Sequence, residues 1–180
     1  MPDIVIANAG FSVGTEGYRA EDIDALARIM QVNVIGLAAT LQPFIVPMRS
    51  RGNGALVGIA SVAGFRGLAG AGAYSASKSA AITWLESLRV ELAGSGIDVV
   101  TICPGYVATP LTAVNRYPMP FLLQAPEAAR RIARAIAARR RFAIIPWQMR
   151  VVSFFLRRMP NWLFDRLFAR APRKARNSPQ

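Results

Sequence analysis

The hydrophobic positions fall into four short continuous runs, separated by longer segments with a helical period. The runs are "DIVIA", "GALVGIAS", "IDVVTICPG" and "FAIIPW", at residues 3–7, 54–61, 97–105 and 142–147. Each run is apolar at successive positions and not only at alternate ones. Such runs are typical of strands in a parallel sheet that is covered by helices on both faces. The pattern therefore predicts an α/β fold with a doubly wound parallel sheet.

Three segments between or after these runs have the pattern of helices. The first is long and begins at Glu21, with acidic residues in its first turn and basic ones near its end, as the helix dipole favours. The second begins at Ala73, and the third at Ala125 in "APEAARRIARAIAARRR". No internal repeat or linker divides the chain. We therefore expect one domain over residues 1–172 and a disordered tail over residues 173–180.

No apolar run approaches the roughly 20 residues that a membrane-spanning helix needs. The N-terminus also lacks the basic start and the apolar core of a secretory signal. The sequence therefore predicts a cytoplasmic protein.

The positive charge of the chain lies almost entirely in its last third. The formal net charge is +12, yet residues 1–124 hold eight basic and eight acidic residues, whereas residues 125–180 hold fourteen and two. Residues 147–172 form a basic amphipathic helical end. Such a segment lies on an anionic membrane surface or, as we favour, covers a crevice or a subunit interface with its arginines in solvent. No nucleic-acid-reading motif accompanies the charge, so we expect no nucleic acid partner.

The chain contains no histidine and a single cysteine, Cys103. The absence of histidine excludes the Ser-His-Asp and Cys-His mechanisms and removes the commonest zinc ligand, so we expect no metal site. Cys103 ends an apolar run, as a small buried residue would. Acid–base chemistry must therefore come from a tyrosine, a lysine or a carboxylate.

Tyr74 and Lys78, in "YSASK", lie four residues apart near the start of the second helix. This spacing places them on one helical face. A nearby ammonium stabilises a phenolate and lowers its pKa from about 10. An ordinary half-buried tyrosine beside a solvated lysine fits the same spacing. Ser61 favours the catalytic interpretation over the ordinary one. It ends a predicted strand, and its side chain should project into the crevice where the next helix begins.

Five motifs occur together in a characteristic order. They are "NAG" at 8–10, Asn33 in "QVNVIG", Ser61 in "IAS", "YSASK" at 74–78 and "PGYVATP" at 104–110. In order and spacing, and over nearly the whole chain, the sequence resembles the classical short-chain dehydrogenase/reductases. The resemblance implies a Rossmann-type domain and an NAD(P)-dependent oxidoreductase that interconverts an alcohol and a carbonyl by hydride transfer.

The resemblance also implies a catalytic role for each of four residues. Tyr74 would exchange a proton with the substrate oxygen, and Lys78 would lower the Tyr74 pKa and bind the nicotinamide ribose. Ser61 would hydrogen-bond the reacting oxygen, and Asn33 would hold a water that links Lys78 to solvent. These roles suit the hydrogen-bonding capacities of the side chains.

The resemblance implies a cofactor site for NADP or NAD at the ends of the strands. Its residues would be Asn8, Ala9, Gly10, Tyr74, Lys78, Pro104, Gly105, Val107 and Thr109. On local grounds Asn8 is equally a turn residue, and Thr109 is equally a helix cap after a Pro-Gly loop.

The first residues resemble a phosphate-binding loop only in outline. Gly10 and Gly14 have the expected interval, but Glu16 stands where a third glycine belongs, and a carboxylate would repel a pyrophosphate. The stretch "MPDIVIANAG" instead resembles the fourth strand of the family. We therefore expect a domain truncated to its C-terminal strands and helices, through an internal start or a genuine truncation. This chain alone should bind NAD(P) weakly. Its strand at 4–7 should form an apolar edge of the sheet.

The segments predicted to line the substrate pocket are mostly apolar. They are "AGFRGLAGAG" after Ser61 and the loop at 106–124. We therefore expect an apolar alcohol or ketone as substrate. Family members commonly pack the helices that begin at Glu21 and Ala73 against a second subunit, which predicts a homo-oligomer. The alternative function is a non-catalytic remnant that binds a membrane surface or a partner subunit through residues 147–176.

Overall fold

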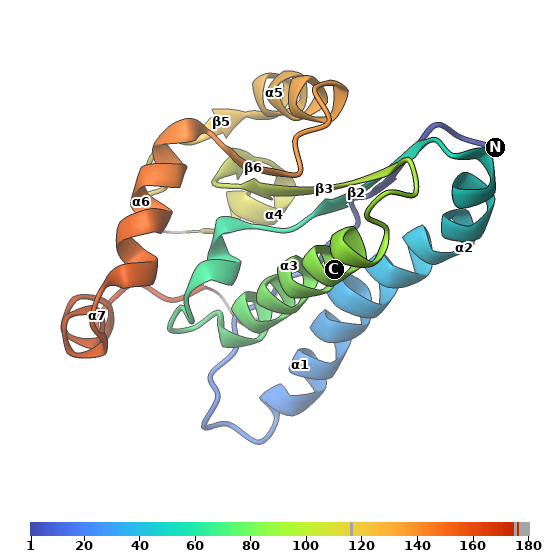
Figure 1. Ribbon diagram of the computed structural model, residues 1–180. Helices are drawn as coiled ribbons and strands as arrows, with labels where there is room; N and C mark the ends of the chain where they lie inside the picture. Colours follow the sequence, from blue (N-terminus) through green and yellow to red (C-terminus); the bar gives the residue numbers. More distant parts are fainter. Residues whose placement is uncertain (116, 175, 177–180) are drawn as a thin grey trace.

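A four-stranded parallel sheet forms the centre of the computed structural model, which describes residues 1–115, 117–174 and 176. The strands lie in the order β1-β2-β3-β6 and run parallel throughout (Figure 1). Their bounds are β1 Ile4–Ala7, β2 Gly54–Ile59, β3 Ile97–Pro104 and β6 Phe142–Ile145. All four strands lie where the hydrophobic runs predict them, and the α/β fold is confirmed.

Helices cover both faces of this sheet. Figure 1 shows α1, α2 and α3 on one side of the strands and α5 on the other. The bounds of these helices are α1 Asp22–Met30, α2 Gly36–Arg51, α3 Gly72–Glu91 and α5 Ala125–Ala137. The shorter elements are η1 Gln31–Ile35, η2 Val62–Phe65, β4 Val107–Ala108, α4 Pro110–Ala113 and β5 Leu123–Gln124. The last two helices are α6 Trp147–Arg158 and α7 Asn161–Phe168.

Two apolar cores, one on each face, explain why the strands are continuously apolar. Successive side chains of a strand point to opposite faces. Leu56 of β2 packs in the core shared with α2 and α3, whereas the next residue, Val57, packs in the core shared with α5. Both side chains are fully buried. A single polar residue in the middle of β2 would therefore lose its hydration whichever face it occupied.

The long helix predicted from Glu21 is divided by one turn of π-helix. Helices α1 and α2 continue one another through η1, in which Asn33 is fully buried. Within the described residues, Asp22–Arg51 is the one helical run long and apolar enough to cross a membrane, although we expected none. In the structure it packs against β1, β2 and α3. A helix that covers a sheet needs the same apolar composition.

The two ends of the chain differ in how they are covered. Strand β1 is the edge of the sheet, and its Ile4 and Ile6 side chains are nearly half exposed, as expected of an apolar edge. At the other end, Arg173 and Arg176 pair with carboxylates near the start of α1, although we expected disorder there. Residues 175 and 177–180 of the predicted tail lie outside the described residues.

Candidate active site

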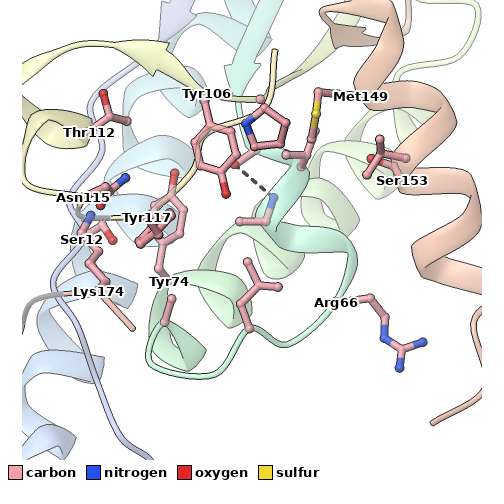
Figure 2. A pocket seen from close by; sticks show the side chains of 18 of the residues that line it. Ser12, Arg66, Tyr74, Tyr106, Thr112, Asn115, Tyr117, Met149, Ser153 and Lys174 are labelled. Atoms are coloured by element: carbon pink, nitrogen blue, oxygen red, sulfur yellow. Dashed lines mark hydrogen bonds between the residues drawn. The ribbon is translucent and has the colours of Figure 1, made fainter. Parts of the chain in front are cut away.

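A cavity lies at the carboxyl ends of β2 and β3. It has a volume of about 350 Å³, and both Ser61 and Tyr74 line it (Figure 2). Ser61 follows β2 and is the N-cap of η2, where its Oγ accepts a hydrogen bond from the Ala63 N–H at 3.2 Å. Tyr74 lies in the first turn of α3. The strand end and the helix start thus bring two hydroxyl groups to one cavity, as the sequence predicts.

Tyr74 lies in a largely apolar environment. Burial raises the pKa of its phenol, and a side-chain hydrogen bond with Ser61 acts in the opposite direction. We expected the Lys78 ammonium to lower this pKa. The Lys78 Nζ instead lies 5.7 Å from the centre of the Tyr74 ring, and burial outweighs the other influences. The phenol of this chain therefore stays protonated at neutral pH, which is the form that donates a proton.

Lys78 is the one charged residue that is buried within the described part of the chain. It is 3% exposed, and its Nζ donates a hydrogen bond to the Ile59 carbonyl oxygen at 2.9 Å. Burial lowers its pKa from 10.5 to about 8, and Cys103 acts weakly in the opposite direction. A Cβ at Gly10 would lie 3.5 Å from this Nζ. The backbone after β1 therefore passes directly beside the ammonium, which the protein covers almost completely.

Asn33 connects three segments of the chain through its amide. Its Oδ1 accepts a hydrogen bond from the Phe11 N–H at 2.7 Å, and its Nδ2 donates to the Phe11 carbonyl and to the Ser77 Oγ, both at 2.9 Å. These bonds fix the loop after β1 against α3. The amide therefore positions Gly10 beside Lys78, and its predicted role as a holder of water stays a prediction.

The predicted cofactor residues all lie at the carboxyl edge of the sheet. The exposed ones follow β1, and the half-buried ones end or follow β3; they are Asn8, Ala9, Gly10, Pro104, Gly105, Val107 and Thr109. Thr109 caps α4 in a capping box with Thr112, so its side chain acts as the helix cap that the sequence also predicted. The backbone between β3 and α4 remains the part of this segment that can meet a ligand.

The sequence profile of short chain dehydrogenases matches residues 2–119, about two thirds of the chain. This chain belongs to the short-chain dehydrogenase family. The match includes all four predicted catalytic residues, Asn33, Ser61, Tyr74 and Lys78. Membership therefore places the chain in a family of oxidoreductases and agrees with the resemblance of its motifs.

Individual relatives support the assignment over most of the chain. An uncharacterized oxidoreductase of Myxococcus xanthus is 44% identical over 163 residues, which are 91% of this chain and 64% of that protein. The ketoacyl reductase HetN of Nostoc is 37% identical over 123 residues, which are 67% of this chain and 42% of that protein. The match thus spans less than two thirds of the length of each of these relatives.

A solved structure supports the fold in the same way. The crystal structure of a short chain dehydrogenase from Burkholderia cenocepacia in complex with NADP has a TM-score of 0.80 and 23% identity. The match covers 94% of this chain and 69% of that one. The described strands and helices therefore have the arrangement of a Rossmann-type dehydrogenase domain.

Several residues that line the cavity of this short-chain dehydrogenase were not predicted individually. The loop at 106–124 was predicted to line it, and it contributes a tyrosine pair and an asparagine. The individually missed residues are Ser12, Arg66, Tyr106, Asn115, Tyr117, Met149, Ser153 and Lys174. Arg66, Tyr106, Asn115 and Tyr117 lie in segments that were predicted to line the pocket, and Lys174 had a signal as one of two lysines among twenty arginines.

We expect the buried lysine to make stability rise with pH between about 8 and 10.5. The folded chain loses the Lys78 proton at a lower pH than the unfolded chain, so the unfolded state binds more protons in this window. Urea unfolding of the wild type and of Lys78→Met at pH 7 to 11 measures the effect. The difference in unfolding free energy should shift in favour of the wild type as pH rises. A difference that is constant with pH would contradict the lowered pKa.

Proposed function

We propose that the whole protein is an NAD(P)-dependent oxidoreductase that interconverts an alcohol and a ketone in the cytoplasm. The observation that carries this proposal is the pair of hydroxyls, Ser61 and Tyr74, that share one cavity beside the buried Lys78 ammonium. The exposed Gly10 lies beside that ammonium, on the side where we propose that the cofactor binds. A nicotinamide cofactor is supported by the Burkholderia relative, which was crystallised with NADP.

Each side chain has a defined task in the proposed reduction. When bound, the reduced nicotinamide supplies the hydride for the carbonyl carbon. The Tyr74 hydroxyl donates its proton to the carbonyl oxygen, and the Ser61 hydroxyl donates a hydrogen bond to the same oxygen. The Lys78 ammonium, which lies beside Gly10, would hold the ribose of the bound nicotinamide. In the oxidation of an alcohol the same proton returns to Tyr74.

The absorbance of the reduced nicotinamide tests the proposed reaction. The whole protein is mixed with NADPH or NADH and a panel of aliphatic and cyclic ketones, and with the oxidised cofactors and the matching alcohols. We expect consumption of NADPH or NADH with at least one ketone, and the reverse change with its alcohol. No change with any cofactor and substrate combination would overturn the proposal.

We also propose that α1, α2 and α3 pack against a second copy of this chain. Apolar side chains on this surface are exposed, among them Ile35 at 53%, Val46 at 68% and Val90 at 62%. Sedimentation of the wild type should show a dimer or a tetramer, and Val46→Asp should shift the population toward monomers by placing a charge in the interface. Val151→Asp makes the same substitution at an exposed position of α6, outside this surface, and serves as control. A monomeric wild type would contradict the interface.

A second candidate function follows from α6 and α7. Their outer surface exposes Trp147, Phe155 and Trp162 at 63% or more, between several arginines of the basic C-terminal third. Aromatic side chains surrounded by arginines suit the interface of an anionic membrane. This surface would dock the enzyme on a bilayer. In a non-catalytic remnant, membrane binding through this surface would be the function of the protein.

Flotation with vesicles tests the membrane surface. We expect the protein to float with vesicles that contain phosphatidylserine and to remain behind with phosphatidylcholine alone. The triple variant Trp147→Ser, Phe155→Ser, Trp162→Ser should float several-fold less, whereas Tyr18→Ser, an exposed aromatic residue outside this surface, should match the wild type. Equal flotation of the wild type and the triple variant would contradict the assignment.

A further inference from the structure

Lys174 brings a positive charge to the wall of the cavity that Ser61 and Tyr74 share. Figure 2 shows it grouped with Ser12 and Asn115 on the side of the cavity near Tyr74. Lys174 is half-buried, and burial lowers its pKa. Within the described part of the chain it has no hydrogen-bond or ion-pair partner. An ammonium that has lost part of its hydration without gaining a counter-charge favours the arrival of an anion.

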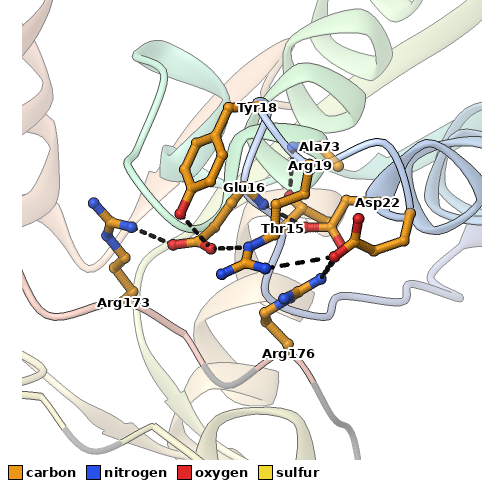
Figure 3. A network of polar contacts seen from close by, with 9 residues as sticks. Thr15, Glu16, Tyr18, Arg19, Asp22, Ala73, Arg173 and Arg176 are labelled. Carbon is orange, nitrogen blue, oxygen red and sulfur yellow. Dashed lines mark hydrogen bonds and ion pairs between the residues drawn. The ribbon is translucent and has the colours of Figure 1, made fainter.

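Ion pairs on both sides of Lys174 hold it in place. Arg173 pairs with Glu16, and Arg176 pairs with Asp22 at 2.7 Å and with Glu21 at 3.4 Å (Figure 3). The three carboxylates lie at or just before the start of α1, more than 150 positions from the two arginines along the chain. The backbone of the tail therefore passes the cavity at a fixed place.

Tight packing supports the same placement independently of charge. A Cβ at Gly70 would lie 2.6 Å from the Arg173 Cβ, so the tail lies directly on the loop that precedes α3. That loop also accepts a hydrogen bond from the Thr15 N–H through the Gly70 carbonyl at 3.1 Å. The tail and this loop thus form one wall of the cavity, to which Leu68, Ala71 and Lys174 contribute.

The other charged side chain on the cavity wall is already engaged. The Arg66 guanidinium donates to the carbonyl oxygens of Leu156 at 3.2 Å and Met159 at 2.9 Å, and it lies 4.1 Å from the centre of the Phe164 ring. No acidic residue of the described ranges lines the cavity. The N–H groups of Arg66 are therefore less available to a bound molecule than the Lys174 ammonium, which has no such partner within the described residues.

An unpaired acceptor lies in the same part of the cavity. The Asn115 Oδ1 is buried and has no hydrogen-bond partner within the described residues, although its Nδ2 contacts the Met119 Sδ at 3.6 Å. The remaining walls are mostly apolar, with Val62, Leu111 and Met149 among them. The cavity therefore combines an apolar body with one group of polar side chains beside the reacting hydroxyls.

We propose that Lys174 binds a carboxylate of the substrate, so that the enzyme acts on aliphatic oxo acids and the corresponding hydroxy acids. This inference rests on the proposed oxidoreductase function, since it places the ketone of the same molecule at Tyr74 and Ser61. It narrows the apolar alcohol or ketone expected from the sequence to an apolar chain that ends in an acid. One ammonium matches one carboxylate, and the apolar walls match the carbon chain between the two groups.

Matched acids and esters test this assignment in the whole protein. Oxohexanoates with the ketone at different carbons are compared with their methyl esters, which keep the ketone and the chain but carry no charge. The wild type should prefer the acid. Lys174→Met should lower kcat/KM for the acid by about 10- to 100-fold, the range of a charged hydrogen bond, and leave the ester unchanged. Lys174→Arg should retain most of the preference, and the affinity for NADPH should be equal in all variants.

Arg170→Met is the matched control, because it removes the same charge from an exposed position four residues earlier in the chain. Removal of both anchors by Arg173→Gln with Arg176→Gln should reproduce the loss seen in Lys174→Met. Three results would overturn the proposal. In Lys174→Met, kcat/KM falls equally for the acid and the ester, or the affinity for NADPH falls. Alternatively, Arg170→Met loses as much kcat/KM for the acid as Lys174→Met does.

A binding measurement separates this inference from the proposed reaction. Calorimetric titration of hexanoate and of methyl hexanoate into the protein with NADP⁺ needs no turnover. Preferred binding of hexanoate that is lost in Lys174→Met supports the carboxylate site even if no ketone is reduced, in which case the oxidoreductase function alone fails. Equal binding of the two compounds by the wild type overturns the carboxylate site.

Discussion

The Tyr74→Phe variant of the whole protein is expected to lose 10²- to 10⁴-fold in kcat, the range that a positioned proton donor contributes. The variant lacks only the hydroxyl that the Ser61 side chain meets in the cavity. Its ring still fills the same space, so the fold and the binding of NADPH should change little. Steady-state kinetics and calorimetric titration of NADPH measure the two effects separately.

Tyr106→Phe is the matched control for this prediction. Tyr106 lines the same cavity and is partly buried, and burial also raises its pKa. Its hydroxyl has no role in the proposed proton transfer. A loss of activity that is similar in the two variants would show that the cavity needs its hydroxyls for packing or hydration and would remove Tyr74 from the role of proton donor.

The sheet could be predicted from the sequence because both of its faces are covered. Neighbouring positions such as Leu56 and Val57 are buried in different cores, so β2 had to be apolar throughout. The site could be predicted for a related reason. The fold itself places the end of a strand next to the start of a helix. Ser61 and Tyr74 therefore lie close together, and this could be predicted without knowledge of the surrounding side chains.

The parts that escaped prediction depend on contacts between distant positions. The hydrogen bonds of Asn33 join α3 and the loop after β1, and its π-helical turn has no signature in the local sequence. The placement of the tail also depends on contacts between distant positions. Its composition indicated disorder, whereas Arg173 and Arg176 pair with carboxylates at the other end of the chain. The raised Tyr74 pKa likewise follows from burial, which a helical spacing does not reveal.

Gly64→Ala is expected to reduce both stability and activity, because η2 lies directly on α3 at this position. A Cβ at Gly64 would lie 2.7 Å from the Lys78 carbonyl carbon and 2.8 Å from the Ser79 nitrogen. Both are backbone atoms of a long helix, which cannot move aside as a flexible side chain would. The loop must therefore shift. We expect a loss of about 1 to 3 kcal/mol in unfolding free energy, as overpacking typically costs.

The loss of activity should exceed what the loss of folded protein explains. The Gly64 N–H donates to the Ser61 carbonyl at 3.1 Å, so a shift of η2 moves the Ser61 hydroxyl relative to Tyr74. A displacement near 1 Å costs roughly 10²-fold in rate. Gly67→Ala is the control, since a Cβ there would meet no atom within 4 Å in the same loop. If Gly64→Ala unfolds at the same urea concentration as Gly67→Ala and keeps wild-type kcat, the close approach of η2 to α3 does not set the geometry of the two hydroxyls.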